Sequence, residues 1–280
     1  RRSMKDLSSI FRPRSVAVLG ASARPGAIGR EVVKNLINYE FQGKVFLVNP
    51  KRDVILSQKA YPTILDIPDP VDMAVVVVPR DTVLDAVRQC GEKGVKGLVI
   101  ITAGFREIGG EGATKEAEVA AELDKYGMVA MGPNTVGVIN TDPEVRLNAS
   151  FIPKPPKHGD VALLSQSGSI GEHIITFANL MDLRFSIFAS LGNQMNVDSS
   201  DLLEYLRRDE KTASTLMYVE SIRSPKTFVE IAKQTTPEKP IAVVKSGRTP
   251  AGARATFSHT GALSGMDVSY DALFEECGIL

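Results

Sequence analysis

Cysteine is nearly absent from this 280-residue chain: there are two, Cys90 and Cys277, and neither belongs to a CxxC or Cys/His cluster. This usage argues against a disulfide framework and a metal site, and it favours a reducing compartment, the cytoplasm. Net charge is absent as well, because 33 basic side chains balance 33 acidic ones. A neutral chain has no global attraction for nucleic acid or a membrane surface, so an anion site must be local.

Long apolar runs are also missing. No run approaches the roughly 18 residues that a helix needs to cross a bilayer, and the start of the chain lacks the apolar core of a signal peptide. The composition is that of an ordinary globular protein, 43% hydrophobic and 24% charged, and the length suggests two domains. Residues 275–280 form no closing element, so we expect a fragment or a subunit of something larger.

Apolar segments alternate with helical patterns through the first half. Strands are expected at residues 15–20, 43–50, 73–79, 97–102 and 128–132, and helices at 30–39, 82–93 and 114–126. This alternation predicts right-handed βαβ units and a doubly wound parallel sheet. We place this Rossmann-like domain at residues 1–150.

Sheets of this type bind ligands at the carboxyl ends of their strands. The first strand ends in a glycine-rich loop, residues 20–29, whose backbone N–H groups suit a phosphate, although tight βα turns need glycine in any case. The second strand ends in Asn49, followed by Lys51 and Arg52, where a NAD-binding unit would carry an acidic residue. These cations favour a ligand with an additional phosphate, NADP or coenzyme A, and a solvated basic turn is the alternative.

A Pro-rich, charged link at residues 154–159 precedes a second alternating region, placed at residues 151–280. Strands are expected at residues 160–164, 185–191 and 215–220 and from 241, with helices ending near 179, 209 and 234. The helix that begins at Ser199 or Ser200 is expected to use a serine as its N-cap. This alternation of strands and helices is typical of a flavodoxin-like domain.

Small residues open the first helix of the second half. The segment Ser165-Gln-Ser-Gly-Ser-Ile-Gly171 offers hydroxyls, an amide and the unpaired N–H groups of a helix start, which together suit an anion. A serine hydrolase is disfavoured, because Ser165 stands where the Gly-x-Ser-x-Gly elbow needs its first glycine.

A Gly-rich, cation-bearing stretch, residues 245–262, follows the last predicted strand and carries His259. An imidazole on such a flexible loop suits a group that accepts and passes on a phosphoryl unit. Glu220, at the end of another strand, can orient an imidazole and stabilise its cationic or phosphorylated form. The alternative is that Glu220 is only an acidic residue at a helix start. We interpret His158, in the link, and His173 as structural.

A series of short segments runs in order over nearly the whole chain. They are residues 15–26, 48–51, 101–105, 132–134, 164–168, 190–193, 198–206, 245–249 and 258–263. This series resembles the α, or CoA-binding, portion of the NDP-forming acyl-CoA synthetases. That family includes the ADP-forming acetate–CoA ligases and, more distantly, the succinyl-CoA synthetase α subunit.

The resemblance implies a Rossmann-like CoA-binding domain followed by a flavodoxin-like domain of the succinyl-CoA synthetase type. It also implies a phosphoryl relay between acyl phosphate, a histidine and ADP, which in reverse activates a short-chain carboxylic acid with ATP. His259 matches the phosphorylated histidine and Glu220 its supporting carboxylate. The phosphate-binding helix start matches Ser167, Gly168 and Ser169, and the CoA site matches Gly20, Ser22, Arg24, Lys51, Val78, Pro79 and Asn134.

The family's ATP-grasp part, which holds the nucleotide and Mg²⁺, has no counterpart in these residues. We therefore expect a β subunit or a fused domain to supply it, within an oligomer. Two other functions remain open. One is a non-catalytic acyl-CoA-sensing domain of a protein acetyltransferase, against which the intact His259 counts. The other is an NADP-dependent oxidoreductase, a function that would be excluded if the protein binds CoA tightly and does not respond to NADPH.

Overall fold

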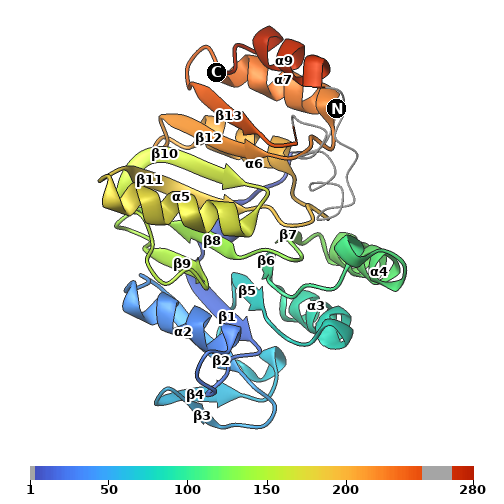
Figure 1. The fold of residues 1–280 in the computed structure, drawn as a ribbon. Coiled ribbons are helices and arrows are strands. Elements are labelled where there is room, and N and C mark those ends of the chain that lie inside the picture. The colour runs from blue at the N-terminus through green and yellow to red at the C-terminus, as the bar shows by residue number, and fades with distance from the viewer. Residues whose placement is uncertain (1–3, 248–266) are drawn as a thin grey trace.

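Two sheets, one built mainly by each half of the chain, organise the computed structural model, which describes residues 4–247 and 267–280 (Figure 1). The first sheet has the order β3-β4-β2-β1-β5-β6-β7 and the second β13-β12-β10-β11-β8-β9. The predicted α/β class, Rossmann-like and then flavodoxin-like, is confirmed. The loop expected around His259 lies outside the described residues.

The first sheet alternates with helices along the chain, as predicted. Its strands are β1 (Ser15–Leu19), β2 (Lys44–Val48), β3 (Val54–Ile55), β4 (Gln58–Tyr61), β5 (Met73–Val76), β6 (Gly97–Ile100) and β7 (Val129–Met131). Its helices are α1 (Ser8–Phe11), α2 (Ile28–Asn38), α3 (Val83–Lys93) and α4 (Glu111–Tyr126), with 3-10 turns η1 (Ile64–Asp66), η2 (Arg80–Thr82) and η3 (Arg106–Ile108).

Strand β1 shows why these segments are largely apolar on both faces. It is parallel to both β2 and β5, and all five of its residues are buried. Val16 and Val18 pack in the same cluster as Val32 of α2, whereas Ala17 and Leu19 pack in the cluster that holds α3. A parallel sheet covered on both faces needs apolar residues at successive positions, which accounts for the sequence pattern.

The second sheet begins earlier in the chain than the sequence indicates. Its strands are β8 (Gly137–Asn140), β9 (Leu147–Ser150), β10 (Lys157–Ser165), β11 (Arg184–Ser190), β12 (Ser214–Val219) and β13 (Ile241–Lys245). Strands β8 and β9, within the residues assigned to the first domain, pair antiparallel at the edge of this second sheet. The domain division at residue 150 stays a prediction. His158 lies within β10 and not in a link, with Nδ1 3.0 Å from Oγ1 of Thr141.

Helices cover the second sheet as α5 (Gly168–Leu180), α6 (Ser199–Arg208), α7 (Pro225–Thr235) and α9 (Asp267–Glu276). The expected serine cap of α6 is wrong: the N-cap is Asp198, whose carboxylate accepts from the backbone N–H groups of Ser200 and Asp201. Asp201 accepts in return from the Asp198 N–H at 3.1 Å, which completes a capping box. Among the described residues, no helix combines the length and apolarity needed to cross a membrane.

Candidate active site

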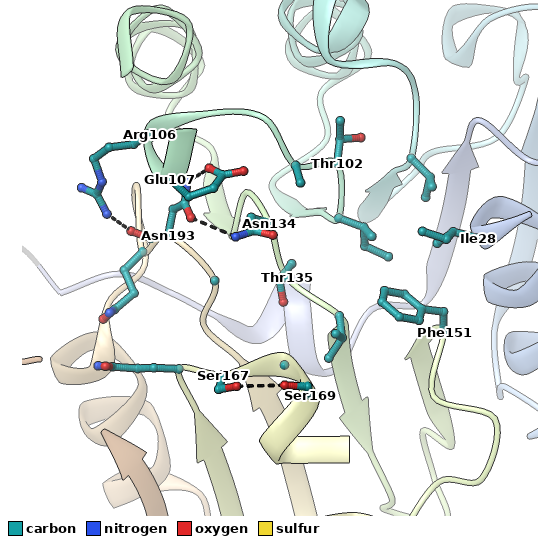
Figure 2. A pocket seen from close by; sticks show the side chains of 18 of the residues that line it. Ile28, Thr102, Arg106, Glu107, Asn134, Thr135, Phe151, Ser167, Ser169 and Asn193 are labelled. Carbon is teal, nitrogen blue, oxygen red and sulfur yellow. Dashed lines mark hydrogen bonds between the residues drawn. The ribbon is translucent and has the colours of Figure 1, made fainter. Parts of the chain in front are cut away.

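A cleft of about 1120 Å³ lies between the two halves of the molecule (Figure 2). Thr102 and Asn134, from the first half of the chain, lie across it from Ser167 and Ser169 of the second half. The predicted site residues that line it are Val78, Pro79, Asn134, Ser167, Gly168, Ser169 and Glu220. Gly20, Ser22, Arg24 and Lys51 are not among its lining residues, and His259 lies outside the described part of the chain.

The loops after β1, β2 and β5 meet at one edge of the first sheet. Leu19 pairs with Val48 on one side and with Val76 on the other, so the strands end level. The side-chain amide of Asn49 donates to the Ala21 carbonyl at 2.8 Å, which fixes the glycine loop against the end of β2. Asn49 therefore holds the backbone and is not available as a ribose ligand of the NAD type.

Gly20 is required by this close packing. Its φ is +92°, and a Cβ there would lie 2.6 Å from the Val77 carbonyl oxygen. Any side chain would push the glycine loop away from the β5 loop, which carries Val78 and Pro79 into the cleft. The glycine thus keeps the first-domain loops and the cleft wall together.

The phosphate-binding segment predicted from the sequence is the start of α5. Ser167 is its N-cap, and its Oγ accepts from the Ile170 N–H at 3.4 Å. Ser169 Oγ lies 3.3 Å from Ser167 Oγ, at the mouth of the helix. Gly168 cannot carry a side chain, since a Cβ would meet Val136 at 2.5 Å. The helix start therefore presents small residues and backbone N–H groups to the cleft, as an anion needs.

Gln166 positions the loop that carries Glu220. Its Oε1 accepts from the backbone N–H of Glu220 at 2.6 Å and of Ser221 at 2.9 Å, and its Nε2 donates to the Ser221 carbonyl. Glu220 lines the cleft with only 7% of its surface exposed. One buried amide thus links the start of α5 to the carboxylate at the end of β12.

A network that the sequence did not reveal joins the two halves at the other end of the cleft. The Asn193 side-chain amide donates to the carboxylates of Glu107, at 2.6 Å, and Glu116, at 2.8 Å. The Arg106 guanidinium donates to the Asn193 carbonyl oxygen and lies 3.7 Å from the Glu116 carboxylate. From the sequence, only the position of Asn193 at a strand end pointed to this network. Glu107 and Glu116 are distant from Asn193 in the chain, so their contacts with it could not be predicted.

Hydrogen bonds keep Glu107 ionised in this network. Burial alone would raise the pKa of Glu107, but the Asn193 amide and the backbone N–H groups of Gly104 and Phe105 outweigh it, so that its pKa lies below the ordinary value. Two carboxylates held against one amide and one guanidinium couple η3 and helix α4 to the β11–α6 loop.

Replacing Asn193 by alanine is expected to lower the free energy of unfolding by about 2–3 kcal/mol, because two carboxylates lose a buried donor. Since the folded-state pKa of Glu107 is depressed, this contribution is present above its unfolded-state pKa, about 4.3. It is lost as the pH falls below that value through the folded-state pKa. Urea titrations at pH 7 and pH 3.5 measure the difference.

Gln89→Ala is the matched control, because the Gln89 amide donates to Asp85 at the surface, at 2.8 Å. Its loss is expected to cost less than about 0.5 kcal/mol. A cost for Asn193→Ala that is equally small, or that does not shrink at pH 3.5, would contradict the role given to the network.

The residues at the strand ends of the first sheet fit coenzyme A. Arg24, Lys51 and Arg52 are exposed beside the glycine loop, where phosphates would find cations, and Val77 and Val78 continue as an apolar wall into the cleft. Such an order suits the phosphates and then the pantetheine arm of CoA. Across residues 4–247 and 267–280, no group of three or more His, Cys, Asp and Glu side chains is placed to hold a metal ion.

Two family models match the chain. One, described as a CoA binding domain, matches residues 14–141, and the other, described as a succinyl-CoA ligase like flavodoxin domain, matches residues 158–280. The acetate–CoA ligase [ADP-forming] I subunit alpha of Pyrococcus furiosus is 44% identical over 98% of this chain and 60% of its own length. The 4-hydroxybutyrate–CoA ligase [ADP-forming] of Nitrosopumilus maritimus is 40% identical over 98% of this chain and 39% of its own length.

A solved structure agrees. The dinucleotide forming acetyl-coenzyme A synthetase 1 of Ca. Korarchaeum cryptofilum, in complex with phosphate and ADP, superimposes with a TM-score of 0.93 and 40% sequence identity. The match covers 98% of this chain and 59% of that one. The chain therefore spans about three fifths or less of these relatives.

Fold and cleft together define a two-domain protein of the CoA-binding, succinyl-CoA ligase type. More narrowly, the chain belongs to the NDP-forming acyl-CoA synthetase family, in which it corresponds to the CoA-binding α portion.

Proposed function

We propose that this chain carries the CoA site and the phosphohistidine of an ADP-forming acyl-CoA synthetase. The observation that best supports this proposal is that residues from both halves of the chain line one continuous cleft. Val78, Pro79 and Asn134 come from the first half, and Ser167, Gly168, Ser169 and Glu220 come from the second. An acyl group on CoA and a phosphate at the start of α5 would then share one space. This proximity is what transfer between them requires.

The proposed reaction has two balanced stages. Phosphate attacks the acyl carbonyl of acyl-CoA, the C–S bond breaks, and acyl phosphate and the CoA thiol are formed. An imidazole nitrogen of His259 then takes the phosphoryl group, the free carboxylate leaves, and ADP later accepts the group as ATP. The reverse sequence consumes an acid, CoA and ATP and gives acyl-CoA, ADP and phosphate.

The residues divide these tasks. We assign phosphate binding to Ser167, Gly168 and Ser169, because backbone N–H groups at a helix start complement an anion. Glu220 stabilises the charged imidazole of His259 during transfer, and Gln166 holds its loop in place. CoA is held by Gly20, Ser22, Arg24, Lys51, Val78, Pro79 and Asn134.

A nucleotide-bearing partner completes the proposal. An ATP-grasp β subunit or fused domain would bring ATP or ADP and Mg²⁺ to His259, within an oligomeric cytoplasmic enzyme. The named relatives include an ADP-forming acetate–CoA ligase subunit alpha, which supports this division of labour. These relatives are ligases and give no support to a non-catalytic acyl-CoA sensor.

The products of the reaction test this function. The complete protein, this chain together with its nucleotide-bearing part, is incubated with acetate as the first probe acid, CoA, ATP and Mg²⁺. We expect acyl-CoA, ADP and orthophosphate in equal amounts, measured by chromatography. Formation of AMP and pyrophosphate, or binding of acetyl-CoA without turnover for any short-chain acid, would contradict the proposal.

A further inference from the structure

The partners of the Asn193 side-chain amide fix its orientation. Its Nδ2 donates to the carboxylates of Glu107, at 2.6 Å, and Glu116, at 2.8 Å. An ionised carboxylate can only accept, so the atom that faces both of them is the nitrogen, which has two hydrogens to donate. Asn193 is only 9% exposed, so little water competes for these bonds. The other end of the amide, Oδ1 of Asn193, is therefore turned away from the two carboxylates.

Asn193 in turn orients Asn134, which lines the cleft. The Asn134 Nδ2 donates to the Asn193 Oδ1 at 3.4 Å. A reversed Asn134 amide would place two acceptor oxygens against each other, which is repulsive. Figure 2 shows the nitrogen of Asn134 turned toward Asn193 and its oxygen on the other side, toward the open cleft. Within the part of the chain that the structure describes, no donor binds this oxygen.

Both halves of the chain hold the backbone that carries Asn134. The Asn134 N–H donates to the Thr102 carbonyl at 3.0 Å, and the Asn193 N–H donates to the Pro133 carbonyl at 2.9 Å. Gly192 permits this approach, because a Cβ there would lie 2.3 Å from the Pro133 oxygen. Asn134 has a φ of +60°, a left-handed conformation that asparagine adopts more readily than most residues. The loop therefore fixes where the Asn134 amide lies, and Asn193 fixes which of its atoms faces the cleft.

We propose that Asn134 Oδ1 is a fixed hydrogen-bond acceptor for CoA, and that it binds the N–H of the amide nearest the thiol in the pantetheine arm. This inference rests on the proposed function. Asn193, Glu107 and Glu116 do not contact CoA in this arrangement. They are positioning residues, which keep the oxygen of Asn134 directed at the ligand.

The chemistry of CoA near its sulfur selects this partner. Asn134 lies across the cleft from Ser167 and Ser169, the proposed phosphate site, where the acyl carbon has to meet the phosphate (Figure 2). The part of CoA beside Asn134 is then the part next to the sulfur. A thioester sulfur and the two methylene groups that follow it donate no hydrogen bond, so the next group, the amide N–H, is the first donor available. Val77 and Val78 line the same cleft and suit the methylene groups.

A fixed acceptor makes the site selective in a way that a freely turning amide would not. If Asn134 could reverse, it would offer its nitrogen to a ligand that carries an oxygen in place of the N–H. Because Asn193 prevents the reversal, such a ligand would place one acceptor against another. The site should therefore reject it, as buried polar groups reject ligands that leave them unpaired.

An analogue of CoA in which an ester oxygen replaces this N–H tests the contact. In the complete protein, calorimetric titration should show the analogue binding about tenfold or more weakly than CoA. Asn134→Ala should bind CoA and the analogue with affinities within about twofold of each other, because it has no side-chain acceptor. A wild-type protein that binds both equally well, or an Asn134→Ala variant that keeps the tenfold preference, overturns the proposal.

The same two ligands separate a positioning role of Asn193 from a merely structural one. In Asn193→Ala the Asn134 amide is free to reverse and to donate to the ester oxygen, so the preference for CoA should fall below about threefold. A loss that is only structural would weaken both ligands and leave their affinity ratio at the wild-type value, which would overturn the positioning role. Gln89→Ala, which removes an amide at the surface, is the control and should keep the wild-type ratio.

A crystal structure of the complete protein with CoA tests the contact without any substitution, so it does not depend on the folding of Asn193→Ala. We expect Asn134 Oδ1 about 2.7–3.2 Å from the amide nitrogen nearest the thiol. A separation beyond about 4 Å would overturn the contact.

Activity of the wild-type sample separates the two failures. Equal affinity for CoA and the ester analogue, in a sample that forms acyl-CoA, ADP and phosphate, overturns this inference and leaves the proposed function intact. Wild-type protein that binds no CoA, or that forms no acyl-CoA from any short-chain acid, overturns the proposed function and this inference together.

Discussion

Replacing His259 by asparagine is expected to abolish acyl-CoA synthesis, with a fall in kcat/KM of about 10⁴-fold or more, because the proposed relay loses the side chain that we assign to carry the phosphoryl group. Asparagine keeps the polarity of the side chain and cannot hold a phosphoryl group as imidazole does. Affinity for CoA should change less than about twofold, since the proposed CoA contacts lie on the other domain. Calorimetric titration with CoA and a coupled ADP assay measure the two quantities.

The control for this substitution is His158→Asn. His158 lies at the start of β10 and contacts Thr141 away from the cleft, so its loss should leave turnover nearly unchanged. Turnover by His259→Asn within tenfold of the wild type would show that the phosphoryl group does not pass through this residue. A simultaneous loss of CoA affinity would indicate misfolding instead, which a thermal melt would detect.

Glu220→Gln is expected to slow turnover by about 10²–10³-fold, because the substitution keeps the shape of the side chain and removes the negative charge that we propose stabilises the imidazole of His259. The loop should keep its position. Gln166 binds the backbone N–H groups of Glu220 and Ser221, and these remain in the variant. Single-turnover formation of phosphohistidine is the measurement, since it isolates the step that the carboxylate assists.

Glu210→Gln provides the matched loss of one carboxylate at an exposed site on the same domain, and it should be without effect. An unchanged rate of phosphohistidine formation in Glu220→Gln would show that Glu220 is only an acidic residue at the end of β12. The relay would then need another charge to stabilise the imidazole.

The parallel strands could be predicted because both their faces are buried. Four successive apolar residues such as residues 16–19 of β1 are favoured in a buried strand, and the helices between the strands show the expected spacing. Strands β8 and β9 carry buried polar residues instead. Asn148 accepts from the Ser150 hydroxyl at 2.6 Å, and Asn35 of α2 donates to the Ser150 carbonyl at 2.8 Å. Because polar residues that form these hydrogen bonds stand among the apolar ones, β8 and β9 lack the continuous apolar pattern from which a buried strand is predicted.

The site was predictable to the extent that strand ends define it. The rule that ligands bind beyond the carboxyl ends of parallel strands selected Val78, Asn134 and Ser167, all of which line the cleft. The same rule did not predict that Glu107 and Glu116 belong to the site. Both carboxylates contact Asn193 only because the two sheets pack together in the folded chain. The order of apolar and polar residues within one segment does not predict such a contact.

The most direct test of the account is transfer of label from ATP carrying ³²P in its γ-phosphate to the complete protein in the presence of Mg²⁺. We predict label on this chain that is labile to acid and stable to base, as expected of a phosphohistidine, that is released by ADP, and that is absent from His259→Asn. An unlabelled wild-type protein that still forms acyl-CoA, or label that persists in His259→Asn, would contradict the phosphohistidine relay.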